Sequence, residues 1–187
     1  RILIKYTLVD AHSPTVLRFR PFLAFRNVNS LCVENYQADT SYQGVSNGIS
    51  VCMYQGYPNL YMQFNKEVNF VSTPYWNKGI EYAKELERGY YYKEDLFVPG
   101  YFEVPIKKGE SIIFSAGVSE VDTANLSQIY YEEISKRTAR NSFFNCLKNS
   151  AQQCFNRKNP EELYLLAGYP WFKCLARDLF ISLPGVS

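Results

Sequence analysis

The sequence predicts a mainly β protein in which an antiparallel β-sandwich is followed by helices. Two features of the pattern support this prediction. Many short segments alternate apolar and polar residues with turn signals between them, and after residue 120 the apolar spacing becomes helical. Strands that come first and helices that come later indicate separate parts of a chain. We therefore expect a sandwich over residues 1–120 and linker helices over residues 121–168.

The first two strands are predicted from composition. Residues 2–9 are rich in β-branched and large apolar side chains, which favours a strand. Residues 16–20 alternate apolar and basic side chains, and Pro21 marks the end or the edge of that strand. We expect Phe19 to be buried and the arginines of this segment to point outward.

A hairpin is predicted next. Asn47-Gly48 is a turn signal, and residues 49–53 and 60–64 each place alternate apolar side chains on one face. The glycine and proline between these two runs favour a loop that joins antiparallel strands. Further strands are expected over residues 68–73, 101–106 and 111–115, with a turn before the last of them.

Residues 79–95 interrupt the strand pattern. Ile80, Ala83 and Leu86 have helical spacing, and Gly89 is a suitable residue for the end of a helix. We therefore expect a short helix inside a charged insertion, and such insertions are often functional when they are ordered.

This insertion also holds side chains that could take part in chemistry. Tyr90, Tyr91 and Tyr92 offer apolar ring faces together with hydroxyl donors, which suits stacking on sugar rings. Glu94 and Asp95 could act as an acid and a base. Neighbouring carboxylates on an exposed loop are more often solvated, so we favour solvated side chains over catalysis here.

Helices are predicted after the sandwich. Residues 126–136 have helical composition. Apolar side chains recur at steps of four from Ala139 to Phe155, which indicates an amphipathic helix. Pro160 suits the first turn of a further helix, which we expect over residues 161–167.

Composition limits the class of protein. A chain of 187 residues with 47% hydrophobic residues can form a packed core, which argues against disorder. A net charge of +2 demands neither nucleic acid nor an anionic membrane as a partner. The first five residues turn polar too early for a signal peptide, so we expect a cytoplasmic protein. The first residue is not methionine, which is consistent with a natural start upstream.

The five cysteines show no CxxC spacing, and the single histidine is His12, which argues against a zinc site. We expect reduced, mostly buried thiols, with no metal and no cofactor. The alternative is a nucleophilic cysteine paired with His12, but no local feature of the sequence marks one.

The last residues carry an aromatic run that leads into an Arg-Asp pair. Arg177 and Asp178 stand at a predicted junction between a loop and a helix. A guanidinium beside a carboxylate offers rigid donors and an acceptor, which suits binding several hydroxyls of one sugar. A structural ion pair explains the same two residues equally well.

This stretch, residues 167–185, resembles the AGYPWF…WGRDTFISLPGL signature of the bacterial and archaeal glycogen-debranching family, the amylo-α-1,6-glucosidases. The resemblance extends over essentially the whole chain. Shorter segments strengthen it in the same order along the chain: residues 6–10, 18–21, 25–27, 87–90 and 94–97.

The resemblance implies a β-supersandwich that precedes an (α/α)₆ barrel, which hydrolyses α-1,6 branch points without a cofactor or a metal. Residues 169–187 would then be the first segment of a truncated barrel. The family's catalytic carboxylates have no counterpart in this chain. By resemblance, the residues that bind the sugar at the cleavage subsite are Arg177 and Asp178, approached by Tyr169, Trp171 and Phe172.

The sequence departs from that signature on both sides of the Arg-Asp pair. Leu175-Ala176 replaces the family's Trp-Gly, and Leu179 replaces its Thr. Loss of the Trp removes a sugar-stacking surface, which suggests a diverged copy.

We therefore expect the glucan-binding, amino-terminal portion of a glycogen-debranching glucosidase, inactive on its own. Its expected partner is α-glucan (glycogen or limit dextrin), with no nucleic acid or membrane, and with self-association through the exposed carboxy-terminal segment. The alternative is a non-catalytic carbohydrate-binding or interaction module from a diverged gene fragment. A third hypothesis, a nucleic-acid binder built on Arg18, Arg20 and Arg26, is opposed by the small net charge.

Overall fold

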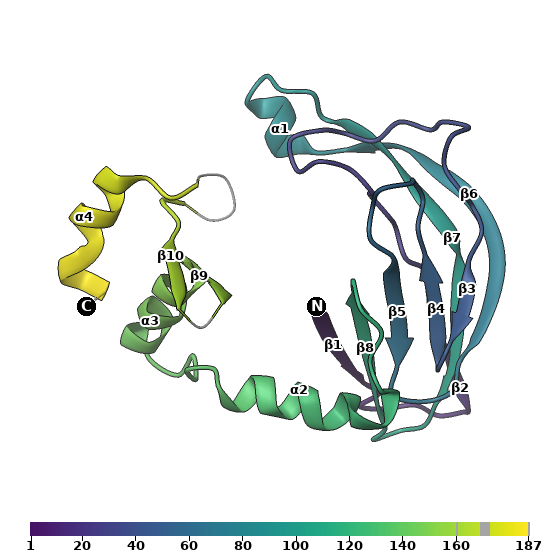
Figure 1. Cartoon of the computed structure of the whole chain (residues 1–187). Coiled ribbons are helices and arrows are strands. Elements are labelled where there is room, and N and C mark those ends of the chain that lie inside the picture. Colours follow the sequence, from purple (N-terminus) through teal and green to yellow (C-terminus); the bar gives the residue numbers. More distant parts are fainter. Residues whose placement is uncertain (160, 169–172, 187) are drawn as a thin grey trace. The chain divides into compact units, whose positions relative to one another are not determined.

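The computed structural model describes residues 1–159, 161–168 and 173–186. The chain divides into two compact units, Arg1–Tyr130 and Tyr131–Ser187 (Figure 1). None of the described helices is long and apolar enough to cross a lipid bilayer.

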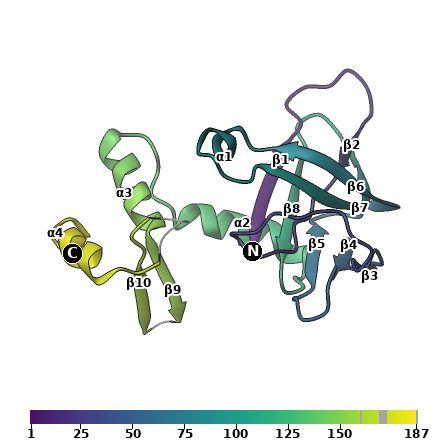
Figure 2. The same cartoon turned by 90° about the horizontal axis from the view of Figure 1, so that it is seen from above.

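The first unit contains two antiparallel sheets, which Figure 1 and Figure 2 show from two directions. The five-stranded sheet has the order β1 (Ile2–Thr7), β8 (Ser111–Gly117), β5 (Leu60–Phe64), β4 (Gly48–Val51) and β3 (Gln43–Val45). The three-stranded sheet has the order β2 (Thr15–Phe19), β7 (Lys93–Ile106) and β6 (Asn69–Glu81). The prediction of a mainly antiparallel β structure before residue 120 is confirmed.

One apolar core is shared by the two sheets. Met62 and Phe64 come from β5, Phe102 and Val104 come from β7, and each is at most 1% exposed. The ring centroids of Phe64 and Phe102 are 5.0 Å apart, so the sheets are in direct contact. Burying each such side chain stabilises the fold by about 1.5–3 kcal/mol. Two antiparallel sheets on one core are consistent with the predicted β-sandwich.

The side chains of β2 alternate as predicted. Phe19 packs against the core, with its ring centroid 5.2 Å from that of Phe64. Arg18 lies directly opposite Glu103 in the ladder with β7 and donates to its carboxylate at 2.7 Å. Phe102 is buried in the core, and successive side chains of a strand point to opposite faces, so the next residue, Glu103, points outward together with the opposing Arg18.

The predicted turn at Asn47-Gly48 is confirmed, with its two-residue loop one residue earlier in the chain. Val45 pairs with Gly48, and Asn47 has a φ of 49°. A Cβ on Gly48 would lie 2.0 Å from the carbonyl oxygen of Met62 in β5, so glycine is required by close packing as well.

The hairpin of β6 and β7 is longer than the sequence pattern indicated. Strands were expected over residues 68–73 and 101–106, whereas β6 has 13 residues and β7 has 14. The helix expected between them is α1 (Ala83–Glu87), only five residues long, at the end of the hairpin. Irregular pairing between Ser72 and Tyr75 breaks the two-residue alternation, which explains the short prediction. The supposed insertion is therefore the far end of one hairpin.

The chain leaves the sandwich through a 3₁₀ turn, η1 (Thr123–Asn125), which leads into α2 (Leu126–Ser135). Asp122 caps this segment, since its side chain accepts a hydrogen bond from the N–H of Ala124 at 3.0 Å. The helix predicted over residues 126–136 is confirmed.

The second unit contains α3 (Phe143–Gln153), the antiparallel pair β9 (Phe155–Asn159) and β10 (Glu162–Leu165), and α4 (Ala176–Val186). The amphipathic helix predicted around residues 139–155 is present as α3. The helix predicted over residues 161–167 is wrong, because β10 occupies that segment. The Asn159 side chain accepts from the N–H groups of Glu161 and Glu162, at 3.0 and 2.8 Å, and this local turn favours a hairpin over a helix.

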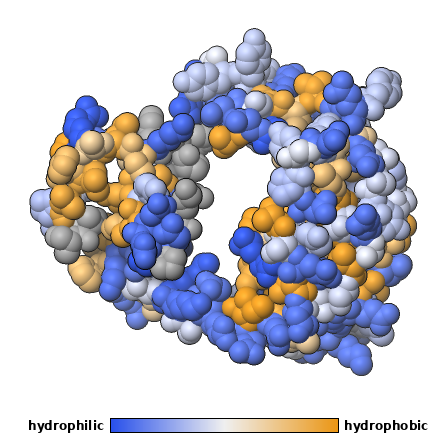
Figure 3. Space-filling model, in the orientation of Figure 1, coloured by the Kyte–Doolittle hydropathy of each residue, from blue (hydrophilic) through white to orange (hydrophobic). Residues whose placement is uncertain are grey.

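Large apolar side chains are exposed in this unit. In α4, Phe180 is 69% exposed and Ile181 is 73% exposed, and Figure 3 shows apolar side chains gathered over this helix. Phe143 and Phe144 at the start of α3 are similarly exposed. The expected exposure of apolar side chains in the last segment is confirmed, and self-association through them stays a prediction.

Candidate functional site

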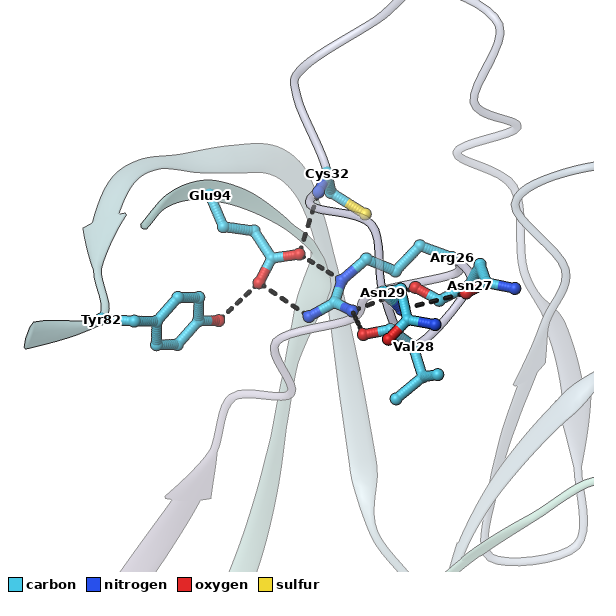
Figure 4. A network of polar contacts seen from close by, with 7 residues as sticks. All are labelled: Arg26, Asn27, Val28, Asn29, Cys32, Tyr82 and Glu94. Atoms are coloured by element: carbon cyan, nitrogen blue, oxygen red, sulfur yellow. Dashed lines mark hydrogen bonds and ion pairs between the residues drawn. The ribbon is translucent and has the colours of Figure 1, made fainter. Parts of the chain in front are cut away.

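A buried carboxylate anchors the end of the β6–β7 hairpin. Glu94, the second residue of β7, is 1% exposed. Figure 4 shows its carboxylate between the guanidinium of Arg26 and the hydroxyl of Tyr82. Arg26 donates to both carboxylate oxygens, from Nε at 2.5 Å and from Nη2 at 3.2 Å. Tyr82 donates at 2.5 Å, and the backbone N–H of Cys32 donates at 2.9 Å.

These donors come from segments that are distant in the sequence. Arg26 and Cys32 lie in the segment between β2 and β3, whereas Tyr82 lies between β6 and α1. Burial alone would raise the pKa of Glu94, but hydrogen bonds from Arg26, Tyr82 and Cys32 outweigh burial and lower that pKa. Glu94 is therefore an ionised acceptor that ties the segment between β2 and β3 to the hairpin.

Asp95 accepts a second set of hydrogen bonds, next to those of Glu94. Its carboxylate accepts from the N–H of Gly79 in β6 at 2.9 Å and from the N–H of Glu34 at 3.0 Å. These two backbone hydrogen bonds lower the pKa of Asp95. The expectation of solvated carboxylates is wrong for Glu94, because the hairpin end buries it. Neither carboxylate is arranged as half of an acid–base pair, since both are engaged by donors of the protein.

The loop after α1 displays the tyrosines noted in the sequence. The N–H of Gly89 donates to the carbonyl of Leu86, and the N–H of Tyr90 donates to that of Glu85, both at 3.0 Å. These two bonds form a Schellman motif, in which Gly89 has a φ of 76°. At the end of this motif, the side chain of Tyr90 is 58% exposed, and that of the next residue, Tyr91, is 93% exposed.

A second aromatic surface lies on the outer face of the three-stranded sheet. The guanidinium of Arg18 lies 4.3 Å from the ring centroid of Tyr101, and that of Arg20 lies 5.9 Å from the centroids of Tyr75 and Tyr101. Because Glu103 offsets the charge of Arg18, this face presents less positive charge to phosphate than the sequence run suggests.

The Arg-Asp pair is found in the first turn of α4. Arg177 Nε donates to Asp178 Oδ1 at 3.1 Å, and the side chains are 81% and 30% exposed. The two residues are adjacent in the sequence, and in the structure their side chains form an ion pair. The aromatic residues predicted to approach them, Tyr169, Trp171 and Phe172, lie outside the described residues.

The described residues offer neither a metal site nor an activated thiol. Within the described ranges no group of three or more His, Cys, Asp or Glu side chains could hold a metal ion. All five cysteines are free thiols, but only Cys32 is buried, so the expectation of mostly buried thiols is wrong. Burial, together with the negative charge of Glu94, raises the pKa of Cys32, which is the reverse of nucleophilic activation.

Comparison with known proteins gives one positive result. No curated protein and no solved structure matches the chain. The family model described as "Glycogen debranching enzyme N terminal" matches residues 1–113, which include all of the three-stranded sheet and most of the five-stranded sheet. The matched range contains Arg26, Tyr82 and Glu94. The chain therefore belongs to the glycogen debranching enzyme N-terminal family.

Proposed function

We propose that this chain is the amino-terminal, glucan-binding portion of a bacterial or archaeal glycogen-debranching amylo-α-1,6-glucosidase polypeptide that acts in the cytoplasm. The observation that carries the proposal is the family match over residues 1–113. In this proposal residues 1–120 form the amino-terminal domain, residues 121–168 form a linker that contains α2 and α3, and residues 169–187 begin the catalytic barrel.

The proposal gives the Arg-Asp pair of α4 a role in sugar binding. Arg177 is highly exposed and uses one N–H on Asp178, so its other donors are available for sugar hydroxyls. Asp178 supplies the acceptor. The aromatic approach to this subsite would come from Tyr169, Trp171 and Phe172.

The proposal also holds that the chain alone hydrolyses no α-1,6 bond. Glycoside hydrolysis requires two carboxyl groups on either side of the bond, at about 6.5–9.5 Å in an inverting enzyme. The adjacent carboxylates of Glu94 and Asp95 are instead engaged by donors of the sandwich itself. Catalysis is left to carboxylates further along the polypeptide.

Two assays test this proposal together. Native electrophoresis through a gel that contains glycogen is expected to retard the chain, and incubation of the chain with limit dextrin is expected to release no glucose. Equal migration with and without glycogen would contradict glucan binding. Glucose release by the purified chain would contradict the second part.

A second candidate function is a non-catalytic carbohydrate-binding or interaction module. The observation that favours it is the replacement of the family's Trp-Gly and Thr by Leu175-Ala176 and Leu179 around the Arg-Asp pair. The gene distinguishes the two candidates. A reading frame that continues past Ser187 for several hundred helical residues favours the enzyme portion, and an early stop codon favours the module.

A further inference from the structure

The end of the β6–β7 hairpin presents two neighbouring tyrosines whose rings are exposed. Tyr91 is 93% exposed and makes no hydrogen bond, ion pair or ring contact within the described part of the chain. Its neighbour Tyr90 is 58% exposed. Exposed aromatic rings in adjacent positions are a common property of binding loops.

The backbone that carries these rings is held in place from both sides. On one side, the Schellman motif at Gly89 fixes the exit from α1. On the other side, the N–H of Tyr82 donates to the carbonyl of Tyr92 at 2.9 Å, which closes the loop at its base. A loop that is fixed before binding loses little conformational entropy when a ligand arrives.

The buried network lies directly beneath this loop. Tyr82 closes the loop through its backbone and also donates its hydroxyl to Glu94, which Arg26 holds through two bonds. Removing Glu94 would therefore loosen the base of the loop as well as the sandwich. The hydrogen-bond network of Glu94 therefore helps to position Tyr90 and Tyr91.

The surroundings of the rings suit a neutral ligand with many hydroxyls. The guanidinium of Arg88 lies 5.1 Å from the ring centroid of Tyr90 and is paired with Glu85 at 3.5 Å. Lys84 is similarly paired with Glu87 at 2.8 Å. Charges in balanced pairs give no net attraction for phosphate, whereas donors and acceptors beside apolar rings match both the hydroxyls and the C–H faces of sugars.

We propose that Tyr90 and Tyr91 form a stacking subsite for consecutive glucosyl units of a linear segment of α-glucan. This proposal rests on the proposed function above and adds where on the sandwich the glucan binds. Because the ligand is neutral, its binding is expected to change little between low and high salt, unlike the binding of a polyanion.

The test compares variants of the full chain by electrophoresis through glycogen gels. Replacing both rings (Tyr90→Ala with Tyr91→Ala) is expected to weaken retardation about tenfold. Tyr91→Phe keeps the ring and is expected to bind like the unchanged chain. Since both side chains are exposed, thermal melting is expected to be unchanged, which separates lost binding from lost folding.

Tyr75→Ala is the matched control, because Tyr75 is also an exposed tyrosine beside a guanidinium, that of Arg20, but lies away from the loop in β6. It is expected to bind glycogen normally. If the double variant is retarded as strongly as the unchanged chain, or if only Tyr75→Ala loses retardation, the subsite proposal is overturned and glucan binding stands. If the unchanged chain is not retarded at all, glucan binding itself fails and the subsite fails with it.

Discussion

At the scale of single residues, one buried carboxylate joins two distant parts of the first unit. Glu94 lies 68 positions after Arg26 in the sequence, and the two side chains form an ion pair in which Glu94 is 1% exposed. Tyr82 and the backbone N–H of Cys32 donate to the same carboxylate. The free energy of unfolding is therefore expected to depend on Glu94.

Removal of the Glu94 carboxylate is expected to destabilise the first unit. Glu94→Ala leaves the partly buried guanidinium of Arg26 without its partner, which costs about 3–5 kcal/mol when one member of a buried pair is lost. Urea unfolding measures this change. The control is Glu87→Ala, which removes an exposed pair with Lys84 and is expected to change stability by less than about 1 kcal/mol.

The same residue predicts how stability depends on pH. Glu94 has a lowered pKa in the folded state, so its contribution is present above the pKa of the unfolded chain and is lost as pH falls through the folded value. The stability difference between the unchanged chain and Glu94→Gln is therefore expected to be largest near neutral pH and to shrink in acid. Urea unfolding at a series of pH values measures it, and a difference that grows in acid would contradict this account.

At the scale of elements, local patterns predicted the existence of most strands but not their length. Segments with clean alternation, such as residues 60–64, were located accurately. The long pair β6 and β7 was underestimated, because the irregular register around Ser72 and the positive φ of Gly79 conceal its continuity. The helix predicted at 161–167 failed because pairing with β9 overrode its helical composition.

The Schellman motif that ends α1 gives a prediction at this scale. Gly89→Ala places a side chain at a φ of 76°, with no atom within 4 Å of the new Cβ, so the cost is conformational and amounts to about 1 kcal/mol. Weaker retardation in glycogen gels is expected to accompany it. Gly44→Ala is the control, because its Cβ would also meet no atom and its φ is not positive. Thermal melting compares the two, and an equal effect would contradict a special role for Gly89.

At the scale of the whole molecule, the family match falls within the first unit, where the sandwich core and the Glu94 network also lie. The sequence predicted strands before residue 120 and the helices α2 and α3 after it, because hydrophobic period is a local property, but it missed the β9–β10 hairpin. It could not predict the burial of Glu94, because its partner Arg26 lies 68 positions away and no local pattern joins the two residues. The Arg-Asp pair of α4 was found where expected, and its role in binding sugar stays a prediction.

The most direct test of the central claim is co-sedimentation of the purified full chain with glycogen, with maltoheptaose as a soluble competitor. We expect the chain to pellet with glycogen at low and at high salt, and to return to the supernatant as maltoheptaose is added. A chain that stays in the supernatant with glycogen, or that pellets regardless of maltoheptaose, would contradict the claim that it is a glucan-binding portion of a debranching enzyme.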